Sequence, residues 1–506
     1  MAESRLDDII QSRKKEIKEL QERGISPFQY GYKRNAVVEG LVAKAGKVKP
    51  GETSGKKYKV AGRIRSMRGH GRVAFADIED MTGRMQLMGQ AKLKNFDVFA
   101  SLSAGDIIGV EGELGKTRKG EPTLFVKGFE LLTKAIRPLP DEWFGLKDTE
   151  TRYRHRHIDL LMNPEVRETF IKRSQIINGL REFFLKEGYV EVATPVLQPT
   201  YGGANARPFT THHNSLDMKM YLRISDEMYL KRLLVGGFEK VFEFCVDFRN
   251  EGIDTKHNPE FWLLEAQTAY EDYEDGMRQI ERAIEHAAKK AHGSTKVKYG
   301  EHTLDFKAPW KKMTMAEAVK KYAGIDSDKK SLAELKKFCK EKHVEVAKGV
   351  EKGQLVAAIF EEFAEPKLIQ PVHIYEYPKE VSPLAKESRK NPACTERFES
   401  FVMGMELTNN YSEMNDPIEL RRRLKEELRR GKEGDEEAHP MDDDFLEAIE
   451  QGFPPASGIG IGVDRLIMLL TDSQSIRDVI LFPVLRGKKT EKIEYFGDEV
   501  KDTVFK

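Results

Sequence analysis

The chain has 506 residues, enough for roughly two to four domains. Its 84 Lys and Arg nearly balance its 83 Asp and Glu, which excludes both a polycationic coat protein for nucleic acid and a chain dominated by an acidic tail. Hydrophobic residues make up 39% of the chain, without the run of about 18 apolar residues that a membrane helix requires and without an apolar N-terminal signal segment. We therefore expect a globular cytoplasmic protein that does not bind a membrane.

Residues 1–55 are predicted to form a basic N-terminal helix and a linker. Residues 1–75 contain 18 Lys and Arg but only 8 Asp and Glu, so the basic charge is local. Apolar residues between Arg5 and Arg23 recur at near-helical spacing among many charges. This predicts one exposed basic helix, whose charged face is either simply solvated or in contact with RNA. Residues 44–59 then have the Pro- and Gly-bearing composition of a linker.

Residues 56–135 have the pattern of a small β-barrel. Five short strand-like runs are separated by Gly-bearing turns: Val60–Arg65, Val73–Ile78, Met85–Met88, Ile107–Glu113 and Thr123–Leu132. Five strands in this length favour a Greek-key barrel of the OB-fold type, which can present aromatic and basic side chains to nucleic acid. Small β-barrels have many other functions, and the strand pattern leaves these open. The local basic charge favours nucleic acid.

The rest of the chain is predicted to form a catalytic domain. Residues 136–160, with two prolines and a basic aromatic patch, predict a hinge, and 161–506 then have a mixed helix and strand pattern. Asn163 and Pro164 together have the pattern of a helix start. Residues 272–366 are rich in Lys and Glu with helical periodicity, which predicts a helical insertion.

The three cysteines are far apart in the sequence. Cys245, Cys339 and Cys394 are odd in number and form no C-x-x-C pair. This spacing speaks against a disulfide framework and against a Cys-ligated zinc. We interpret them as small buried apolar thiols.

Three stretches carry residues that could do chemistry, and the first is glycine-rich. Gly458, Gly460 and Gly462 alternate before an apolar helix that has Arg465 in its first turn. Alternate glycines let the backbone approach a ligand closely, and a helix N-terminus favours an anion. A tight helix–strand crossing would give the same pattern. Arg465 favours a ligand phosphate, because a cation at that end of a helix is otherwise unfavourable.

The second stretch is a predicted strand, loop and returning strand. Arg249 and Glu251 end the first strand, and His257 and Phe261 begin the second. Arg249 can hold a carboxylate or phosphate with two hydrogen bonds, Glu251 can accept hydrogen bonds, and Phe261 can stack on a ring. The alternative is an ordinary hairpin with surface charges.

The third stretch is a series of acids. Glu399, Glu406 and Glu413 are seven residues apart, with Asn409 and Tyr411 between them, in a segment that favours strand and turn. Clustered acids without a nearby basic partner imply a cation, either Mg²⁺ or a positively charged ligand. The three stretches together suit a nucleoside triphosphate, its magnesium and a cationic small molecule.

Two of these stretches, the glycine-rich one and the hairpin, together with residues 188–195 resemble the three signature motifs of the class II aminoacyl-tRNA synthetases in their order and distances. Motif one resembles Gly188–Pro195 with the helix before it, motif two Phe248–Phe261, and motif three Gly458–Arg465. Three further stretches are similar to lysyl-tRNA synthetases of subclass IIb, whose nearest relatives act on aspartate and asparagine: Arg152–Leu160, Val381–Ala385 and Asn409–Asp416. The resemblance implies an α+β catalytic domain, with a mainly antiparallel sheet flanked by helices, behind an OB-fold anticodon-binding domain.

The resemblance also implies the nucleotide and metal sites. Arg249 and Arg465 would be the catalytic residues, and Arg249 would grip both the ATP α-phosphate and the lysine carboxylate. Glu399 and Glu406 would hold Mg²⁺. The ATP-binding residues would be Arg249, Glu251, His257, Asn258, Phe261, Glu399 and Arg465.

A lysine site follows from the same resemblance. The ε-ammonium would lie near Glu265, Tyr411 and Glu413, and the α-ammonium near Glu227. The whole lysine-binding set would be Gly202, Gly203, Glu227, Arg249, Glu265, Gln267, Asn409, Tyr411 and Glu413. Gln267 departs from the family pattern, which often has a tyrosine there, so the ammonium would meet one phenol fewer.

The implied function is ATP-dependent attachment of L-lysine to the 3′ end of tRNA(Lys) through a lysyl-adenylate. Arg63, Phe75 and Gln86 of the barrel would read the anticodon, and motif one would form a homodimer. Two alternatives remain. A ligase that attaches lysine to a protein uses the same core but lacks the barrel. A non-enzymatic RNA-binding or scaffold protein would not need the adenylate-forming residues, which this chain retains.

Overall fold

The structure of the protein is a computed structural model. It describes residues 2–140, 148–204, 206–347, 349–432 and 440–487. The chain divides into two compact units, Met1–Leu146 and Lys147–Lys506. Part of the predicted hinge (141–147) and the end of the predicted catalytic domain (488–506) lie outside the described residues. Among the described helices, none has both the length and the apolar character needed to cross a membrane.

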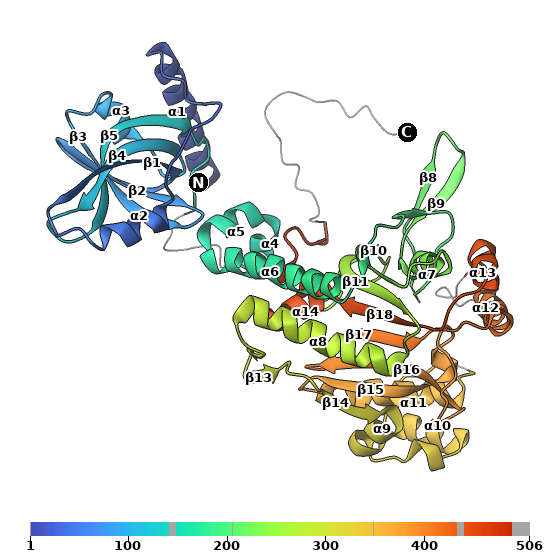
Figure 1. Ribbon diagram of the computed structural model, residues 1–506. Coiled ribbons are helices and arrows are strands. Elements are labelled where there is room, and N and C mark those ends of the chain that lie inside the picture. Colours follow the sequence, from blue (N-terminus) through green and yellow to red (C-terminus); the bar gives the residue numbers. More distant parts are fainter. Residues whose placement is uncertain (1, 141–147, 205, 348, 433–439, 488–506) are drawn as a thin grey trace. The chain divides into compact units, whose positions relative to one another are not determined.

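The first unit is built around a closed barrel with the strand order β1-β2-β3-β5-β4 (Figure 1). The strands are β1 (Thr53–His70), β2 (Val73–Asp80), β3 (Gly83–Gln90), β4 (Ile107–Lys116) and β5 (Pro122–Thr133). Side chains alternate as a half-buried strand requires: on β2, Ala74, Ala76 and Ile78 are buried between more exposed neighbours. The five predicted strands and the barrel are confirmed.

The predicted N-terminal helix exists as α1 (Ala2–Glu22), but it is not wholly exposed. Ile10 and Leu20 are buried, and Leu20 belongs to the barrel core. The guanidinium of Arg13 is also buried, and it donates to the backbone carbonyls of Ala135 at 3.0 Å and Arg137 at 3.1 Å. Because the helix binds backbone carbonyl groups through Arg13 and buries apolar side chains against the barrel, one side of it is fixed to the barrel.

The predicted linker, residues 44–59, is wrong in its second half. Helix α2 (Val38–Ala45) ends as the segment begins, and β1 starts inside the segment at Thr53. Ser54 and Gly55, which suggested a linker, lie within β1, and the backbones of Lys57 and Lys59 pair with β4 while their charged side chains face solvent. A third helix, α3 (Phe96–Ser101), lies between β3 and β4.

The second unit is centred on an eight-stranded sheet with the order β14-β15-β16-β17-β18-β11-β10-β6 (Figure 1). Neighbouring strands are antiparallel except for β14 with β15 and β6 with β10, so the predicted mainly antiparallel α+β fold is confirmed. The strands are β6 (Val190–Glu191), β10 (Lys240–Phe248), β11 (Glu260–Ala269), β14 (Lys311–Thr314), β15 (Val372–Pro378), β16 (Cys394–Val402), β17 (Met405–Ser412) and β18 (Ala456–Gly462).

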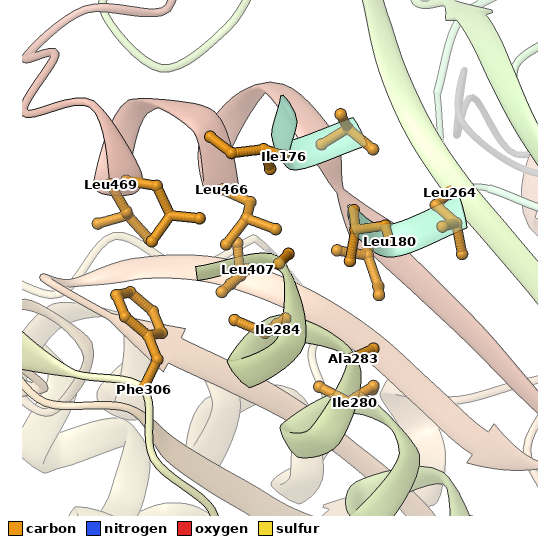
Figure 2. Close-up of a cluster of buried hydrophobic side chains, with 14 of the residues drawn as sticks. Ile176, Leu180, Leu264, Ile280, Ala283, Ile284, Phe306, Leu407, Leu466 and Leu469 are labelled. Carbon is orange, nitrogen blue, oxygen red and sulfur yellow. The ribbon is translucent and has the colours of Figure 1, made fainter. Parts of the chain in front are cut away.

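Three helices pack on this sheet around its main hydrophobic core. They are α6 (Pro164–Lys186), which begins where predicted, α8 (Tyr273–His292) and α14 (Val463–Leu470). Figure 2 shows Leu180 of α6, Ile280 and Ile284 of α8 and Leu466 of α14 gathered near Leu407 of β17. Each such side chain contributes about 1.5–3 kcal/mol on full burial. This core holds in place the strands that carry the functional residues.

The predicted hinge, residues 136–160, extends too far into the second unit. Helices α4 (Thr149–Arg154) and α5 (Arg156–Met162) lie within its second half. Arg156 is buried and donates to Asp159 at 2.6 Å and to the carbonyl of Arg477 at 2.8 Å. A buried arginine held by a carboxylate and a carbonyl fixes this segment to the second unit, so it cannot serve as a hinge.

The predicted helical insertion, residues 272–366, is only partly correct. Its first helix, α8, belongs to the main core, because its apolar face packs on the sheet. A hairpin and strand β14 follow, and only α9, α10 and α11 form a separate helical cluster. The elements of this region not yet given are β12 (Lys296–Tyr299), β13 (His302–Asp305), α9 (Met315–Ala323), η1 (Ser327–Lys329), α10 (Leu332–Glu341), α11 (Lys352–Phe363) and η2 (Glu365–Lys367).

The remaining elements surround the sheet. Strands β7, β9 and β8 form a small sheet of their own. Helices α7 and α13 share a second hydrophobic core with residues of α12. The bounds are β7 (Leu197–Gln198), β8 (Thr210–His213), β9 (Met218–Leu222), α7 (Glu227–Val235), η3 (Lys379–Val381), α12 (Pro417–Lys432), α13 (Asp443–Glu450) and α15 (Ile476–Val479).

Candidate active site

Motifs two and three and the acidic stretch meet in one cavity of about 630 Å³. Its lining comes mainly from β11 and the loop before it, and from β16, β17, β18 and α14. Of the residues predicted to act in this unit, all but Gly202 line it. They are Gly203, Glu227, Arg249, Glu251, His257, Asn258, Phe261, Glu265, Gln267, Glu399, Glu406, Asn409, Tyr411, Glu413 and Arg465. Residues up to 262 positions apart in the chain therefore share one site, as Gly203 and Arg465 do.

The hairpin of β10 and β11 brings Arg249 against Phe261. Arg249 directly follows β10, Phe261 stands near the start of β11, and the guanidinium carbon lies 5.0 Å from the ring centroid. Nε of Arg249 is buried and meets no acceptor among the described residues. A buried donor without an acceptor costs about 1–3 kcal/mol. This guanidinium is therefore suited to bind an anion.

Arg465 lies in the first turn of α14, as predicted, and connects two of the motifs. Its guanidinium donates to the backbone carbonyl of Glu406 at 2.7 Å and to the Glu406 carboxylate at 3.2 Å. It also lies 3.2 Å from Nε2 of His257, whose Nδ1 lies 2.8 Å from Asp254. With Nδ1 donating to Asp254, Nε2 is free to accept from Arg465. The imidazole thus orients the guanidinium.

Glu399 is an acid with a basic partner, contrary to the prediction that the acids lack one. Its carboxylate accepts from the hydroxyl of Tyr377 at 2.8 Å and from Arg397 at 2.5 Å. Arg397 and Glu399 are two apart on β16 and so lie on the same face. Burial raises the pKa of Glu399 to about 7; Arg397 opposes this rise, and the charge of Glu406 adds to it.

Glu399 and Glu406 fit a hard divalent cation. The charge of Glu406 raises the pKa of Glu399, so the two carboxylates are close enough to repel each other. The side chain of Glu406 stays 40% exposed and can contact a ligand bound in the cavity. Carboxylate oxygens are the ligands that Mg²⁺ takes in proteins, often together with substrate phosphates. A cation here would join a cluster that already contains Arg397 and Arg465.

The acids predicted to receive lysine surround a lysine of the chain itself. Nζ of Lys231 is buried, lies 2.6 Å from Glu413 and forms a close ion pair with Glu227. Tyr411 donates to Glu227 at 2.7 Å, and the amide of Gln267 donates to Glu413 at 2.8 Å. Burial alone would lower the pKa of Lys231, but the two acids outweigh it and raise the pKa. One ammonium group thus already balances one of the two negative charges of Glu227 and Glu413. This corrects the expectation that the acids of this stretch have no basic partner.

Glu265 is the acid of this group without a basic partner among the described residues. It lies on β11 and accepts from the hydroxyl of Ser225 at 3.2 Å. Burial raises its pKa, and the charges of Asp226 and Asp247 raise it further. An incoming ammonium ion would find its strongest negative charge here.

The other predicted residues have plainer surroundings. Gly203 has φ of +87°, and a Cβ there would lie 2.8 Å from the hydroxyl oxygen of Ser225, so glycine is required beside this pocket. Gly202 packs against Met228 instead of lining the cavity. The amide oxygen of Asn409 accepts from Arg397 at 3.1 Å.

Two charged residues of the site were not predicted. Lys231 lies four residues after Glu227 on α7, a spacing that places both on one helix face. Arg397 precedes Glu399 by two residues on a strand. Both spacings were visible in the sequence, but nothing there showed that Lys231 is buried between Glu227 and Glu413 or that Arg397 lines the cavity.

The three residues predicted to read the anticodon lie on strands of the barrel. Phe75 is half-buried on β2, on the face opposite to the buried Ala74 and Ala76. Arg63 donates to the carbonyl of Gly105 at 2.8 Å, and burial lowers its pKa. The amide oxygen of Gln86 accepts from Thr123 at 3.0 Å. These contacts leave the face of the Phe75 ring as the group best suited to stacking.

Both units match families of known proteins. Residues 148–486 match the model of the class II tRNA synthetases (D, K and N), and residues 58–132 match that of the OB-fold nucleic acid binding domain. The lysine–tRNA ligase of Carboxydothermus hydrogenoformans is 47% identical over 492 residues, which cover 96% of this chain and 100% of that protein. The chain belongs to the lysine–tRNA ligase family of class II synthetases. Another member, from Clostridium novyi, is 48% identical over 498 residues, 96% of each chain.

The family membership confirms the predicted class II synthetase. The lysine–tRNA ligase of Clostridium perfringens strain 13 is 48% identical over 500 residues, covering 96% of this chain and 98% of that protein. The synthetase match begins at residue 148, next to the boundary between the two units at Lys147. The OB-fold match covers the barrel strands from within β1 to β5. The predicted order of a barrel followed by a catalytic unit is thereby confirmed.

Proposed function

We propose that the protein attaches L-lysine to the 3′ end of tRNA(Lys) in two steps, with ATP as co-substrate and lysyl-adenylate as intermediate. The observation that carries the proposal is that one cavity contains a cation and an acid that each lack a partner of opposite charge among the described residues. Arg249 has a buried Nε without an acceptor, and Glu265 has no basic partner among the described residues. Lysine offers the complementary pair, a carboxylate and an ammonium, and the cavity volume leaves room for a nucleotide beside it.

In the first step, an oxygen of the lysine carboxylate attacks the α-phosphorus of ATP. The bond from this phosphorus to the bridging oxygen of pyrophosphate breaks, and pyrophosphate leaves. Arg249 and Arg465 would stabilise the charge that develops on the phosphoryl oxygens, and no nucleophile from the protein is required. Phe261, with Glu251, His257 and Asn258, would hold the nucleotide. Magnesium, held by Glu399 and Glu406, would supply further positive charge against the phosphates.

In the second step, a terminal ribose hydroxyl of tRNA attacks the carbonyl carbon of the adenylate, and AMP leaves. We propose that Phe75 stacks on an anticodon base while Arg63 and Gln86 bind base edges, since aromatic stacking is the usual means of holding single-stranded bases. The OB-fold barrel favours tRNA over a protein acceptor, because a protein-lysylating enzyme would not need it.

Lysine selectivity would come from the acids. Glu265 would receive the ε-ammonium together with Tyr411 and Glu413, and Glu227 and Gly203 would lie near the α-ammonium. A buried cation is costly unless carboxylates meet it, and a pocket for aspartate would need a basic group instead. Gln267 donates to Glu413 and helps to fix that carboxylate, although it supplies no phenol.

The proposal includes a homodimer and a cytoplasmic location. Three large apolar side chains around motif one are exposed in the single chain, namely Leu185 (49%), Val190 (46%) and Leu197 (46%). Such side chains beside the two-residue edge strand β6 suit a symmetric interface.

The test is amino-acid-dependent pyrophosphate exchange run with all twenty amino acids. We expect exchange with lysine and little with the others. Charging assays with tRNA and with protein acceptors then separate the alternatives. Transfer to protein but not to tRNA would favour the protein ligase, and a complete lack of exchange would favour the non-enzymatic scaffold.

A further inference from the structure

Glu265 belongs to a buried group of four side chains, and the mechanism above does not use the other three. Asp226, Cys245, Asp247 and Glu265 each place one ligand-type atom so that all four atoms lie within 4.8 Å of one another. Asp226, Cys245 and Asp247 are fully buried. Cys245 and Asp247 are two apart on β10, Glu265 is on the neighbouring strand β11, and Asp226 stands just before α7.

Asp226 is a carboxylate without an N–H or hydroxyl donor. Both of its oxygens are buried and accept from no such group among the described residues, so the carboxyl of Glu265 beside it is its hydrogen-bonding neighbour. It occupies the N-cap position of α7, where an aspartate usually accepts from the helix backbone, yet its side chain makes no capping bond. The hydroxyl of Ser225 accepts from the backbone N–H of Glu227 instead. The Asp226 carboxylate is thus turned away from its ordinary partner and toward the other three groups.

The charges around this group do not balance. Besides its three acids, Glu243 is buried nearby and pairs with Arg223 at 2.7 Å; Arg223 also lies 3.3 Å from Asp247. Arg249 lowers the pKa of Asp247 and is the second cation near the group. Four carboxylates thus face two guanidinium groups, an excess of two negative charges that becomes three once Cys245 ionises on a metal, and a divalent cation would remove most of it. Without a cation, burial raises the pKa of Asp226 and Glu265, and protons would have to neutralise them.

We propose that Asp226, Cys245, Asp247 and Glu265 bind a divalent metal ion of the zinc class. Zinc is held by four ligands from cysteine sulfur and carboxylate oxygen, at about 2.0–2.3 Å, so its ligand atoms lie about 3–4 Å apart. The observed group needs only a small contraction to reach that geometry. The thiol decides the metal class, because Mg²⁺ and Ca²⁺ avoid sulfur whereas zinc and cobalt accept it. An ammonium ion would gain little from a thiol.

The spacing of the cysteines in the sequence argued against a metal site, because no second cysteine lies near Cys245. The fold supplies the other ligands as carboxylates. Cys245 has no second cysteine near it in sequence, but three carboxylates surround it in space. Its thiol makes a long hydrogen bond of 3.7 Å to the carbonyl of Leu263, which a metal–thiolate bond would replace. The bound ion would fix the position of Glu265 at the amino-acid pocket. The metal site itself does not rest on the proposed function.

The test measures metal binding by the full-length protein without lysine, ATP or tRNA. We expect one zinc ion per chain to remain after dialysis against metal-free buffer, and added Co²⁺ to give a thiolate-to-cobalt charge-transfer band. Cys245→Ser should remove this band and weaken zinc binding about tenfold or more. The matched control is Cys339→Ser, a second buried cysteine in the helical cluster of α9 to α11, which should change neither. Glu406→Gln should also leave the zinc content unchanged.

Three results would overturn the proposal. The first is a zinc content that is no higher in the wild type than in Cys245→Ser, and the second is a cobalt band that persists in Cys245→Ser. The third is a wild type that binds no metal together with an Asp226→Asn variant that melts at a higher temperature than the wild type. The last result would mean that protons neutralise the group. If Asp226→Asn does not fold, the Cys245→Ser pair still decides the question. Since lysine-dependent exchange is measured separately, loss of metal and loss of activity can be told apart.

Discussion

The two sets of charges in the cavity are built differently. The phosphate-side set, Arg249 and Arg465, keeps donor capacity open: Nε of Arg249 meets no acceptor among the described residues, and Arg465 is held partly by a backbone carbonyl. The amine-side acids, Glu227 and Glu413, are buried and already paired with Lys231. This difference indicates that nucleotide binding draws on free positive groups, whereas lysine selectivity draws on a prearranged negative network with one spare acid, Glu265.

The largest expected effect comes from removing the internal cation. Lys231→Met should lower the free energy of unfolding by about 3–5 kcal/mol, because Glu227 and Glu413 would remain buried without their partner. Chemical denaturation measures it. Lys289→Met, an exposed partner of Glu285 on α8, is the control and should change stability by less than about 0.5 kcal/mol. Equal effects in the two variants would show that the network is not prearranged.

Removing the open donor should act on the reaction and not on stability. Arg249→Ala should slow lysine-dependent pyrophosphate exchange by about a hundredfold or more, on the order of 3 kcal/mol, because one clamp on the transition state is lost. Exchange kinetics at saturating ATP and lysine measure it. Arg278→Ala, an exposed arginine on α8, is the control and should be neutral. Near-normal exchange by Arg249→Ala would remove its assigned role.

A smaller and selective effect is expected at the amine side. Glu413→Gln keeps the shape of the side chain and removes its charge, so the KM for lysine should rise about tenfold, close to 1.4 kcal/mol. The KM for ATP should change much less. Separate titrations of lysine and ATP measure both values. An equal rise in the two would contradict the division of the cavity into two sets.

The anticodon face should affect only the second step. Phe75→Ala should raise the KM for tRNA about tenfold, within the 1–3 kcal/mol typical of one stacked base. Pyrophosphate exchange, which needs no tRNA, should stay unchanged. A loss of exchange in this variant would mean that the barrel has a structural role in the enzyme.

The smallest expected effect is a dependence of Mg²⁺ binding on pH. The pKa of Glu399 is raised from 4.5 to about 7 by burial, and a protonated carboxyl binds Mg²⁺ poorly. The Mg²⁺ concentration needed for half-maximal exchange should therefore rise, by at most about tenfold per pH unit, as the pH falls below about 7.

The same raised pKa has a predicted effect on stability. In the absence of Mg²⁺ the folded state keeps this proton up to about pH 7, while the unfolded chain releases it near 4.5. The contribution of Glu399 to the free energy of unfolding should thus fall as the pH rises between these values. Glu399→Gln should flatten this part of the stability profile, and an unchanged profile would place the titration elsewhere.

Local patterns in the sequence were enough for most elements and for the motifs. Alternation predicted the five barrel strands, and the apolar run after Arg465 predicted the helix that the structure shows as α14. They failed where the same local pattern serves two purposes. Residues 272–292 have helical periodicity whether the helix is an insertion or part of the core. Ser54 and Gly55 have the composition of a linker although they belong to β1.

The sequence by itself determined the family, the order of the two units and the residue types of the site, because these depend on motifs read along the chain. Only the tertiary structure decided which charges meet. It paired Lys231 with Glu227 and Glu413, left Arg249 open, and gathered Cys245 with three carboxylates from β10, β11 and the start of α7. The physical reason is burial: the energy of a charge depends on its neighbours in space and on the water it loses, and neither is written in the spacing of residues.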